Sequence, residues 1–281
     1  MNNINYLTIK TMKKISVLFA IAAVCAGMVS CGHKKAAGEA QSAAATEKSQ
    51  EELQQEEYIK VQLDSLAAEM LKLKPLDFVA TDGEGRVVLT EQEKQVKPEY
   101  LMKADVINDL QTLSQKYRAA ALLYVDKKVA DLYDMSVVEY DESLTKLYFD
   151  INDPKLKDIF SSENTVDALK AFYDSSKESG RTPFFWDLCA AAIVEHVYVA
   201  AQNSEKFLSA FDDDSASELT LQIALLTVAI DQLAEINPEY TEINEALKPV
   251  GVINAISVDQ FREQLAQVKE EVAGSRAALL K

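Results

Sequence analysis

Residues that interrupt helices are scarce in this chain. Its 281 residues include eight glycines and six prolines, and runs in which β-branched and polar residues alternate are few. Glycine weakens a helix and proline breaks it, so long segments without either residue favour helix over strand. We therefore predict an all-α protein, built as an irregular multi-helix bundle.

Apolar residues recur at steps of three and four along most of the chain, as they do on one face of a helix. A capping box at Thr90 and Glu93 opens a short helical piece, and Gly180 stands where a helix ends. Pro98 suits the first turn of a long helix that runs to about residue 134. The other expected helices cover residues 51–74, 141–150, 154–160, 164–179, 184–201, 215–236, 239–247 and 257–279.

The segment 184–201 marks the centre of the predicted fold. Its only strongly polar residues are Asp187, Glu195 and His196, and a helix that is apolar on nearly every side belongs inside a bundle. The helix that follows the acidic turn at residues 212–214 is also apolar on two sides. We expect these two helices, joined by a short turn, to form a core hairpin.

One segment departs from the helical pattern. Two short apolar runs, residues 78–80 and 87–89, flank a turn that contains Gly83 and Gly85. A turn of this kind between short apolar runs is typical of two paired strands. We therefore predict a small β-hairpin near residues 76–90.

The N-terminal region carries a targeting pattern. Lys13 and Lys14 precede an apolar stretch of 14 residues, 15–28, which is shorter than the ~20 residues that cross a membrane as a helix. Ser30 then stands immediately before Cys31. This arrangement resembles the signal peptide of bacterial lipoproteins, in which the cysteine that follows a small residue receives the lipid.

The resemblance divides the chain into three parts. Residues 1–30 are expected to be a signal peptide, with Met12 as an alternative start, and residues 51–281 to be a single helical domain. Residues 31–50 between them lack large apolar side chains and are expected to be a flexible tether. Three acyl chains on Cys31 would hold the protein permanently on a membrane.

The lipoprotein resemblance also implies a location. The residue after the cysteine is Gly32 rather than an aspartate, as in lipoproteins that are passed on to the outer membrane. We expect a cell-envelope protein whose N-terminal lipid attaches it to the outer membrane. The body would then face either the periplasm or the cell surface.

The charge of the chain limits its partners. Its formal net charge is −16, and removal of the signal peptide, which carries three lysines and no acid, lowers the charge to −19. Such a body repels phosphate backbones, so we expect no nucleic-acid partner. With Cys25 removed and Cys31 acylated, Cys189 is the one cysteine left, so the core rather than disulfides has to supply stability.

Three ionisable residues of the central segment are candidates for a ligand site or a polar core site. Asp187 and Glu195 lie within ~80° around a helix but ~12 Å apart along its axis, so the two alone cannot share a proton or bridge two metal ions. The Glu-x-x-His pairs of di-metal bundles are absent from the sequence. His196 points away from Asp187, as a buried imidazole bonded to a backbone carbonyl does. We expect structural contacts here, with no catalytic residue, metal or cofactor; a ligand site or catalysis is the alternative.

An aromatic cluster begins the same segment. Phe184, Phe185 and Trp186 fan over ~200° of a helix, so they cannot all face one partner helix. Core packing is the first interpretation, and a ligand or partner site that includes Trp186 is the alternative. The acidic turn 212–214 lacks the spacing of a calcium loop, and the sequence has no glycine-rich phosphate loop.

Together these features predict a lipid-anchored envelope protein whose helical body is a non-catalytic module that binds a protein or a small molecule. Two alternatives stay open. One is a hydrolase or metal-dependent enzyme that uses the acids of the central helix. The other is an oligomeric scaffold of the envelope, held together by contacts between helices.

Overall fold

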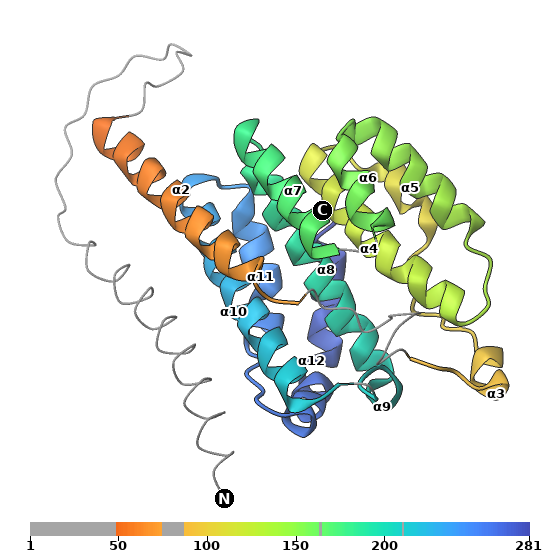
Figure 1. The fold of residues 1–281 in the computed structure, drawn as a ribbon. Helices are drawn as coiled ribbons and strands as arrows, with labels where there is room; N and C mark the ends of the chain where they lie inside the picture. Colours follow the sequence, from red (N-terminus) through yellow and green to blue (C-terminus); the bar gives the residue numbers. More distant parts are fainter. Residues whose placement is uncertain (1–48, 75–86, 163–164, 210) are drawn as a thin grey trace, which may run out of the picture. The chain divides into compact units, whose positions relative to one another are not determined.

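The computed structural model describes residues 49–74, 87–162, 165–209 and 211–281. The chain divides into two compact units, 1–50 and 51–281, and the fold described here is that of the second. Every regular element in these ranges is helical (Figure 1). The prediction of an all-α multi-helix bundle is therefore confirmed. The predicted hairpin falls mostly on residues 75–86, outside the described ranges, and residues 87–90 form no strand.

The helices follow one another along the chain, with residues 71–90 between α2 and α3. Their bounds are α2 (Gln50–Met70), α3 (Glu91–Gln95), the 3-10 helix η1 (Ala104–Asp109), α4 (Leu113–Leu132), α5 (Val138–Ile151), α6 (Pro154–Ser161), α7 (Thr165–Glu178), α8 (Thr182–Gln202), α9 (Ser204–Phe207), α10 (Asp213–Ile236), α11 (Tyr240–Gly251) and α12 (Val258–Ala278). Gly180 follows α7 with a φ of +68°, a backbone conformation that suits glycine.

The predicted long helix 98–134 is wrong in its first half. The helix α4 begins only at Leu113, because Thr112 forms a capping box with Gln115. The residues before it form η1, which buries Ala104 and Ile107. An apolar pattern that fits one long helix is thus satisfied by a 3-10 turn followed by a new α-helix.

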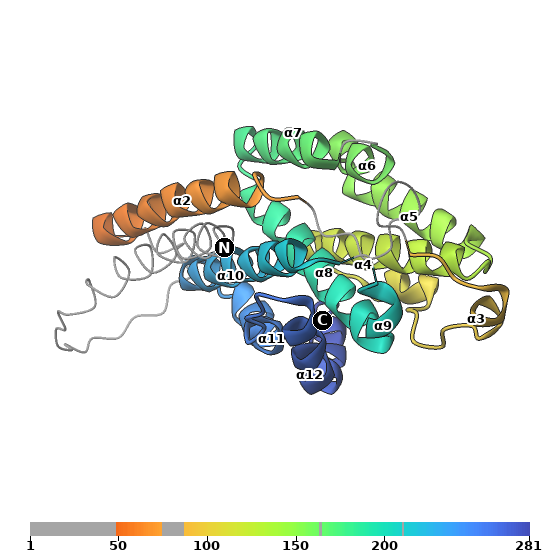
Figure 2. The ribbon, with the colours of Figure 1, turned by 60° about the horizontal axis from the view of Figure 1, so that its bottom comes forward.

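Helix α8 lies at the centre of the bundle, as predicted. It packs most extensively on α4 and α12 and also contacts α7, α9, α10 and α11 (Figure 2). Most of its residues are buried, and they lie on all sides of the helix. The predicted core hairpin is confirmed in part: α10 contacts α8, but α9 lies between them in the chain, and α10 packs more extensively on α11.

Helix α2 lies beside α7 and α10 (Figures 1 and 2). Its apolar face buries Ile59, Leu63 and Leu66. The Asp64 carboxylate accepts a hydrogen bond from the Tyr173 hydroxyl of α7. Helix α2 is therefore part of the folded body rather than of the segment before it.

Two described helices, α8 and α10, are long and apolar enough to cross a membrane. Within the bundle, 83% of the most apolar part of α8 and 50% of that of α10 is buried. The central helix of a bundle has the same length and composition as a membrane span. Their composition alone is therefore weak support for membrane insertion.

Candidate functional site

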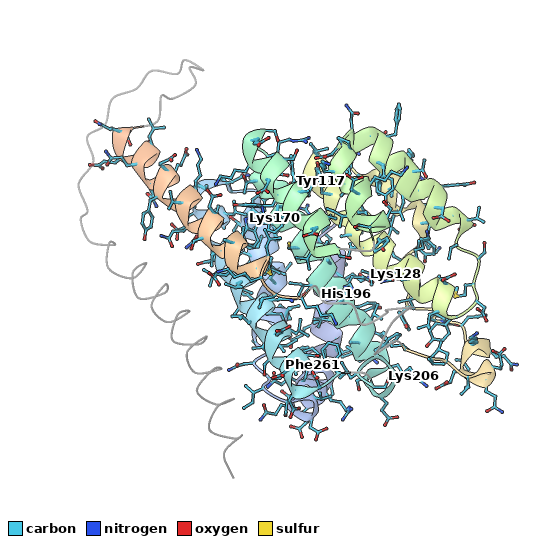
Figure 3. All side chains as sticks on the ribbon, in the orientation of Figure 1. Tyr117, Lys128, Lys170, His196, Lys206 and Phe261 are labelled. Carbon is cyan, nitrogen blue, oxygen red and sulfur yellow. The ribbon has the colours of Figure 1, made fainter. Side chains whose placement is uncertain are left out.

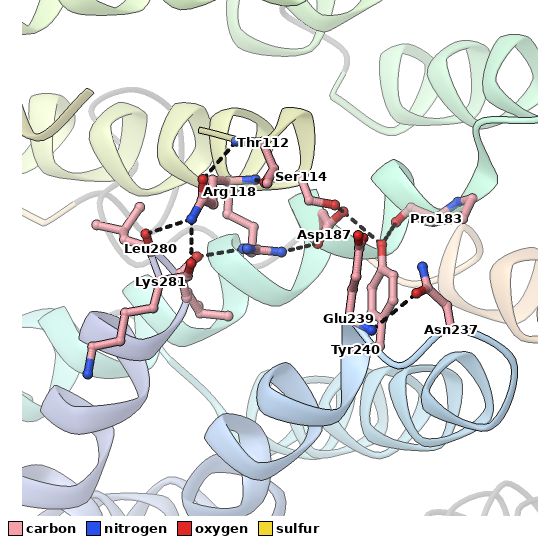
Figure 4. Close-up of polar contacts among 12 residues, drawn as sticks. Thr112, Ser114, Arg118, Pro183, Asp187, Asn237, Glu239, Tyr240, Leu280 and Lys281 are labelled. Atoms are coloured by element: carbon pink, nitrogen blue, oxygen red, sulfur yellow. Dashed lines mark hydrogen bonds and ion pairs between the residues drawn. The ribbon is translucent and has the colours of Figure 1, made fainter. Parts of the chain in front are cut away.

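Asp187 lies at the centre of a buried polar cluster that joins three helices (Figure 4). Its side chain is fully buried, and its Oδ1 lies 2.7 Å from Nη1 of Arg118 on α4. Its Oδ2 accepts hydrogen bonds from the hydroxyls of Ser114, at 2.6 Å, and of Tyr240 on α11, at 2.8 Å. Both carboxylate oxygens are thus occupied by donors from other helices.

The same cluster extends from Arg118 to the end of the chain (Figure 4). Arg118 donates from Nε to the carbonyl of Leu279, at 2.5 Å. The neighbouring Gln115 donates from its amide to the carbonyls of Leu280 and Lys281. These bonds connect the first turns of α4 with the residues that follow α12.

Two opposing effects act on the Asp187 carboxyl. Burial raises its pKa, while Arg118 and the hydroxyls of Ser114 and Tyr240 act in the opposite direction by stabilising the anion. Burial and the adjacent Asp187 carboxylate also raise the pKa of Tyr240. The Tyr240 phenol therefore stays protonated and remains a donor to the carboxylate.

Glu195 lies in a second buried cluster, two turns further along α8. Arg276 of α12 contacts two carboxyl groups at once: its Nε lies 2.6 Å from Glu195 Oε2, and its Nη2 lies 2.5 Å from Asp126 Oδ2 on α4. Its Nη1 donates to the carbonyl of Tyr100, at 2.9 Å. The guanidinium also lies 4.4 Å from the centre of the Tyr198 ring, which permits a cation–π contact.

One guanidinium cannot neutralise two ionised carboxylates. Asp126 Oδ1 and Glu195 Oε1 are both buried, and neither accepts a hydrogen bond from a donor of the described residues. Burial and then the neighbouring Asp126 raise the pKa of Glu195 well above its usual range. The fold thus favours a protonated Glu195, which can donate to Asp126, so that Arg276 balances a single negative charge.

His196 belongs to neither cluster. It is buried on α8 (Figure 3), and its Nδ1 lies 2.8 Å from the carbonyl oxygen of Ala192, one turn earlier. The predicted bond from this imidazole to a backbone carbonyl is confirmed. The three candidates Asp187, Glu195 and His196 therefore do not converge, since each has its own set of partners.

The aromatic cluster at the start of α8 does not face a single partner helix, as the helical wheel predicted. Phe184 stacks on Tyr117 of α4 with ring centres 4.8 Å apart, and Phe185 meets Tyr173 of α7 at 4.9 Å. Trp186 is fully buried and packs edge to face on Phe185. This position favours the core interpretation of Trp186 over the ligand-site alternative.

A fourth buried carboxylate, that of Asp153, lies at the start of α6. Asp153 caps α6 by accepting a hydrogen bond from the backbone of Lys155. It also accepts a hydrogen bond from the hydroxyl of Tyr117, at 2.8 Å, and binds Arg181 at 2.7 Å. Nothing in the periodicity of the sequence singled out this group.

Sequence reasoning identified the acids of α8 but missed their cationic partners. Arg118 and Arg276 stand 69 and 81 residues from the acids of α8 that they bind. A compositional signal was nevertheless present, since the chain has 24 lysines and only five arginines. Three of these five, Arg118, Arg181 and Arg276, bind buried acids, as expected for the cation better suited to buried pairs.

A small hollow opens between α4, α5 and α6, away from these clusters. Its volume is about 230 Å³. Three aromatic rings, two lysines, one acid, one leucine and two hydroxyl side chains line it: Tyr124, Tyr148, Phe160, Lys127, Lys157, Asp141, Leu144, Thr145 and Ser161. Sequence reasoning did not predict it, because its residues come from three separate helices.

Within the described ranges, no group of three or more histidine, cysteine, aspartate or glutamate side chains is arranged to hold a metal ion. Cys31, the predicted lipid attachment site, lies outside the described residues. No protein-family model, curated protein or solved structure matches the chain. The function therefore has to be inferred from the chain's own chemistry.

Proposed function

We propose that this protein is a lipid-anchored envelope protein whose helical body is a non-catalytic binding module. The observation that carries the second half of the proposal is the burial of the central acids. Asp187 and Glu195 are both 0% exposed, and arginines from other helices bind them. Acids held in this way connect helices, and no substrate in solution reaches them.

The hollow between α4, α5 and α6 is the best candidate for the binding site. It is concave, and aromatic rings line it together with a few polar groups, as is typical of small-molecule sites. It also lies outside the two clusters that hold α8 in place. A ligand can therefore enter it without disrupting the ion pairs of the core.

The first half of the proposal rests on Cys31. A basic start, a short apolar stretch and Ser30 precede this cysteine, and acylation there would attach the body to the outer membrane. The acidic body, with its net charge of −16 for the whole chain, makes the lipid rather than a charged surface the means of attachment. The same charge argues against nucleic acid as a partner.

Replacement of Cys31 by serine tests the anchor. Cells grown with labelled palmitate are expected to incorporate label into the wild-type chain, which sediments with the envelope, whereas C31S takes up no label and leaves the membrane fraction. The matched control is Cys25→Ser, which should leave both labelling and sedimentation unchanged. Unchanged label and sedimentation in C31S would refute the anchor.

Catalysis at the central acids would contradict the binding proposal. The test is any turnover by the purified protein that disappears in Glu195→Ala while the variant keeps its helical circular dichroism and a cooperative unfolding transition. The proposal predicts no such activity.

A further inference from the structure

The hollow between α4, α5 and α6 has a composition that selects among small ligands. Each of the three helices contributes one ring: Tyr124, Tyr148 and Phe160. Phe160 lies close to both tyrosines, with ring centres 4.5 Å from Tyr124 and 6.0 Å from Tyr148. All three side chains are only partly buried. Part of each ring therefore remains exposed to a ligand, and the Lys128 ammonium lies 5.7 Å from the centre of the Tyr124 ring.

One positive charge at the hollow is not balanced. Lys127 is paired with Asp141 at 2.5 Å. Lys157 is exposed, and its ammonium has no partner among the described residues. The acids nearest to it in sequence are already engaged: Asp153 binds Arg181, and Asp158 binds Lys155. In a chain with a net charge of −16, an unpaired ammonium beside aromatic rings offers a specific contact to an anion.

The size of the hollow restricts the ligand further. A volume of about 230 Å³ lies below the roughly 300–1,000 Å³ of typical small-molecule pockets. That space fits a single six-membered ring with one substituent, and a longer oligomer would extend beyond it.

The polar groups distinguish an aromatic ring from a sugar ring. A sugar needs hydrogen-bond partners for several hydroxyls, but Asp141 and Lys127 already bind each other. Thr145 and Ser161 supply aliphatic hydroxyl groups at the hollow. The Ser161 hydroxyl already donates a hydrogen bond to the backbone carbonyl of Lys157. The rest of the wall is Leu144, Lys157 and three rings, two of which are tyrosines. Such a wall favours an apolar ring with a charge at one end.

We propose that the hollow binds a small aromatic carboxylate: a single planar ring that packs against Tyr124, Tyr148 and Phe160, with its carboxylate on the ammonium of Lys157. This inference rests on the proposed binding role of the body and names the class of ligand for it. No covalent step is involved.

Equilibrium dialysis of labelled benzoate against the full-length protein in detergent tests the inference. We expect saturable binding to one site, with benzyl alcohol and glucuronate competing at least tenfold more weakly than unlabelled benzoate. The first competitor lacks the carboxylate, and the second replaces the aromatic ring by a sugar ring.

Two variants locate the site. Lys157→Gln should weaken benzoate binding about tenfold, which is ~1.4 kcal/mol and close to the lower limit for a hydrogen bond to a charged group. Lys60→Gln, which removes the same charge from an exposed position on α2, should leave the affinity unchanged. Phe160→Leu should also weaken binding, and the thermal unfolding midpoint of each variant shows that it is folded.

Three results would overturn the inference: no saturable binding of benzoate by the folded wild-type protein, equal affinities of wild type and K157Q, or equal competition by glucuronate. Equal competition by glucuronate with the loss in K157Q retained would move the ligand class to sugar acids and leave the binding role intact. The acylation experiment at Cys31 is independent, so its failure would remove the anchor and not the ligand class.

Discussion

The Tyr240 hydroxyl is one of three donors to a carboxylate that has no access to water. It lies 2.8 Å from Asp187 Oδ2, and its loss leaves part of a buried charge without a partner. Hydrogen bonds to charged groups contribute about 1.5–3 kcal/mol, roughly twice the contribution of neutral ones. We therefore predict that Tyr240→Phe lowers the free energy of unfolding by about 2 kcal/mol, measured by urea denaturation.

Tyr140→Phe is the matched control. The Tyr140 hydroxyl is also in a largely buried side chain and donates at 2.8 Å, but to the neutral carbonyl of Met102. We expect a loss of about 1 kcal/mol there. Equal losses in the two variants would mean that the Asp187 cluster is held mainly by Arg118 and Ser114.

Glu195 differs from Asp187 because its cluster has two carboxyl groups for one guanidinium. We predict that Glu195→Gln costs less than about 1 kcal/mol at pH 7, since a neutral amide can make the same bonds as a protonated acid: its oxygen accepts from Arg276, and its NH₂ donates to Asp126. Arg276→Met, by contrast, leaves buried acids unpaired and should cost about 3–5 kcal/mol.

The pH dependence of stability gives a second measurement. Because burial and Asp126 raise the pKa of Glu195 above its usual value of 4.5, the folded state binds this proton more tightly than the unfolded state. The stability that the protonated Glu195 adds to the folded state is therefore fully present below pH 4.5. It decreases as the pH rises through the raised pKa of Glu195. The pKa values of Asp126 and Asp187 are also raised. The contribution of Glu195 is therefore measured as the free energy of unfolding of the wild type minus that of Glu195→Gln at each pH. A difference that stays constant from pH 4.5 to 8 would indicate an ionised Glu195.

At this scale the sequence predicts which acids are unusual but not what binds them. Asp187 and Glu195 stand out because the residues around them are apolar, a property of adjacent positions. Their partners depend on which helices become neighbours, and Arg118 and Arg276 reach α8 from α4 and α12. The rarity of arginine in a lysine-rich chain is a compositional signal that could have indicated those positions.

Helix α4 depends on a specific start. Thr112 accepts a hydrogen bond from the backbone of Gln115, and the Gln115 side chain accepts one from the backbone of Thr112. The loss of an N-cap typically costs ~1 kcal/mol. We predict that Thr112→Ala lowers the free energy of unfolding by about 1 kcal/mol, because α4 carries Arg118 and Asp126 into the core.

Thr90→Ala is the corresponding control, because Thr90 and Glu93 form the same capping box on α3. Helix α3 has five residues and buries none of them. Loss of the Thr90 cap should fray α3 without changing the global free energy of unfolding by more than about 0.3 kcal/mol. Equal effects in Thr112→Ala and Thr90→Ala would mean that α4 does not need its cap.

The positions of most helices could be predicted from N-caps, from the period of the apolar residues and from proline and glycine. The segment before α4 is the exception. The segment before α4 buries Ala104, Ile107 and Leu110, at spacings that fit a helical face. Its backbone instead places the carbonyl of Tyr100 on Arg276 and the amide of Met102 on Asp126. Those tertiary bonds compete with an α-helix, and periodicity cannot detect them.

At the scale of the whole molecule, the buried charges act as selective connections between helices. An Arg–Asp pair joins α4 to α8, and Arg276 joins α12 to both. Buried ion pairs contribute little net stability compared with apolar contacts, while a wrong pairing leaves an unpaired charge. We therefore interpret them as determinants of which helices pack together, with apolar contacts supplying most of the stability.

The final prediction concerns the boundary of the folded body. The buried side chains of the described residues begin at Ile59 on α2 and continue to Leu279. A body of ~230 residues is large enough to bury most of its apolar surface without assistance. We predict that a chain starting at Glu51 unfolds in one cooperative transition, with a midpoint within about 2 °C of the full-length protein by circular dichroism.

A shorter chain tests the same boundary from the other side. Starting at Leu71 removes α2 and with it the buried side chains of Ile59, Leu63 and Leu66. Each such side chain contributes about 1.5–3 kcal/mol when buried, and the bonds from Asp64 to Tyr173 and Lys177 are lost as well. This chain should unfold at least 5 °C below the one that starts at Glu51, since 1 kcal/mol shifts the midpoint by about 2–4 °C at this size. Equal midpoints for the two shortened chains would place the boundary of the folded body after α2.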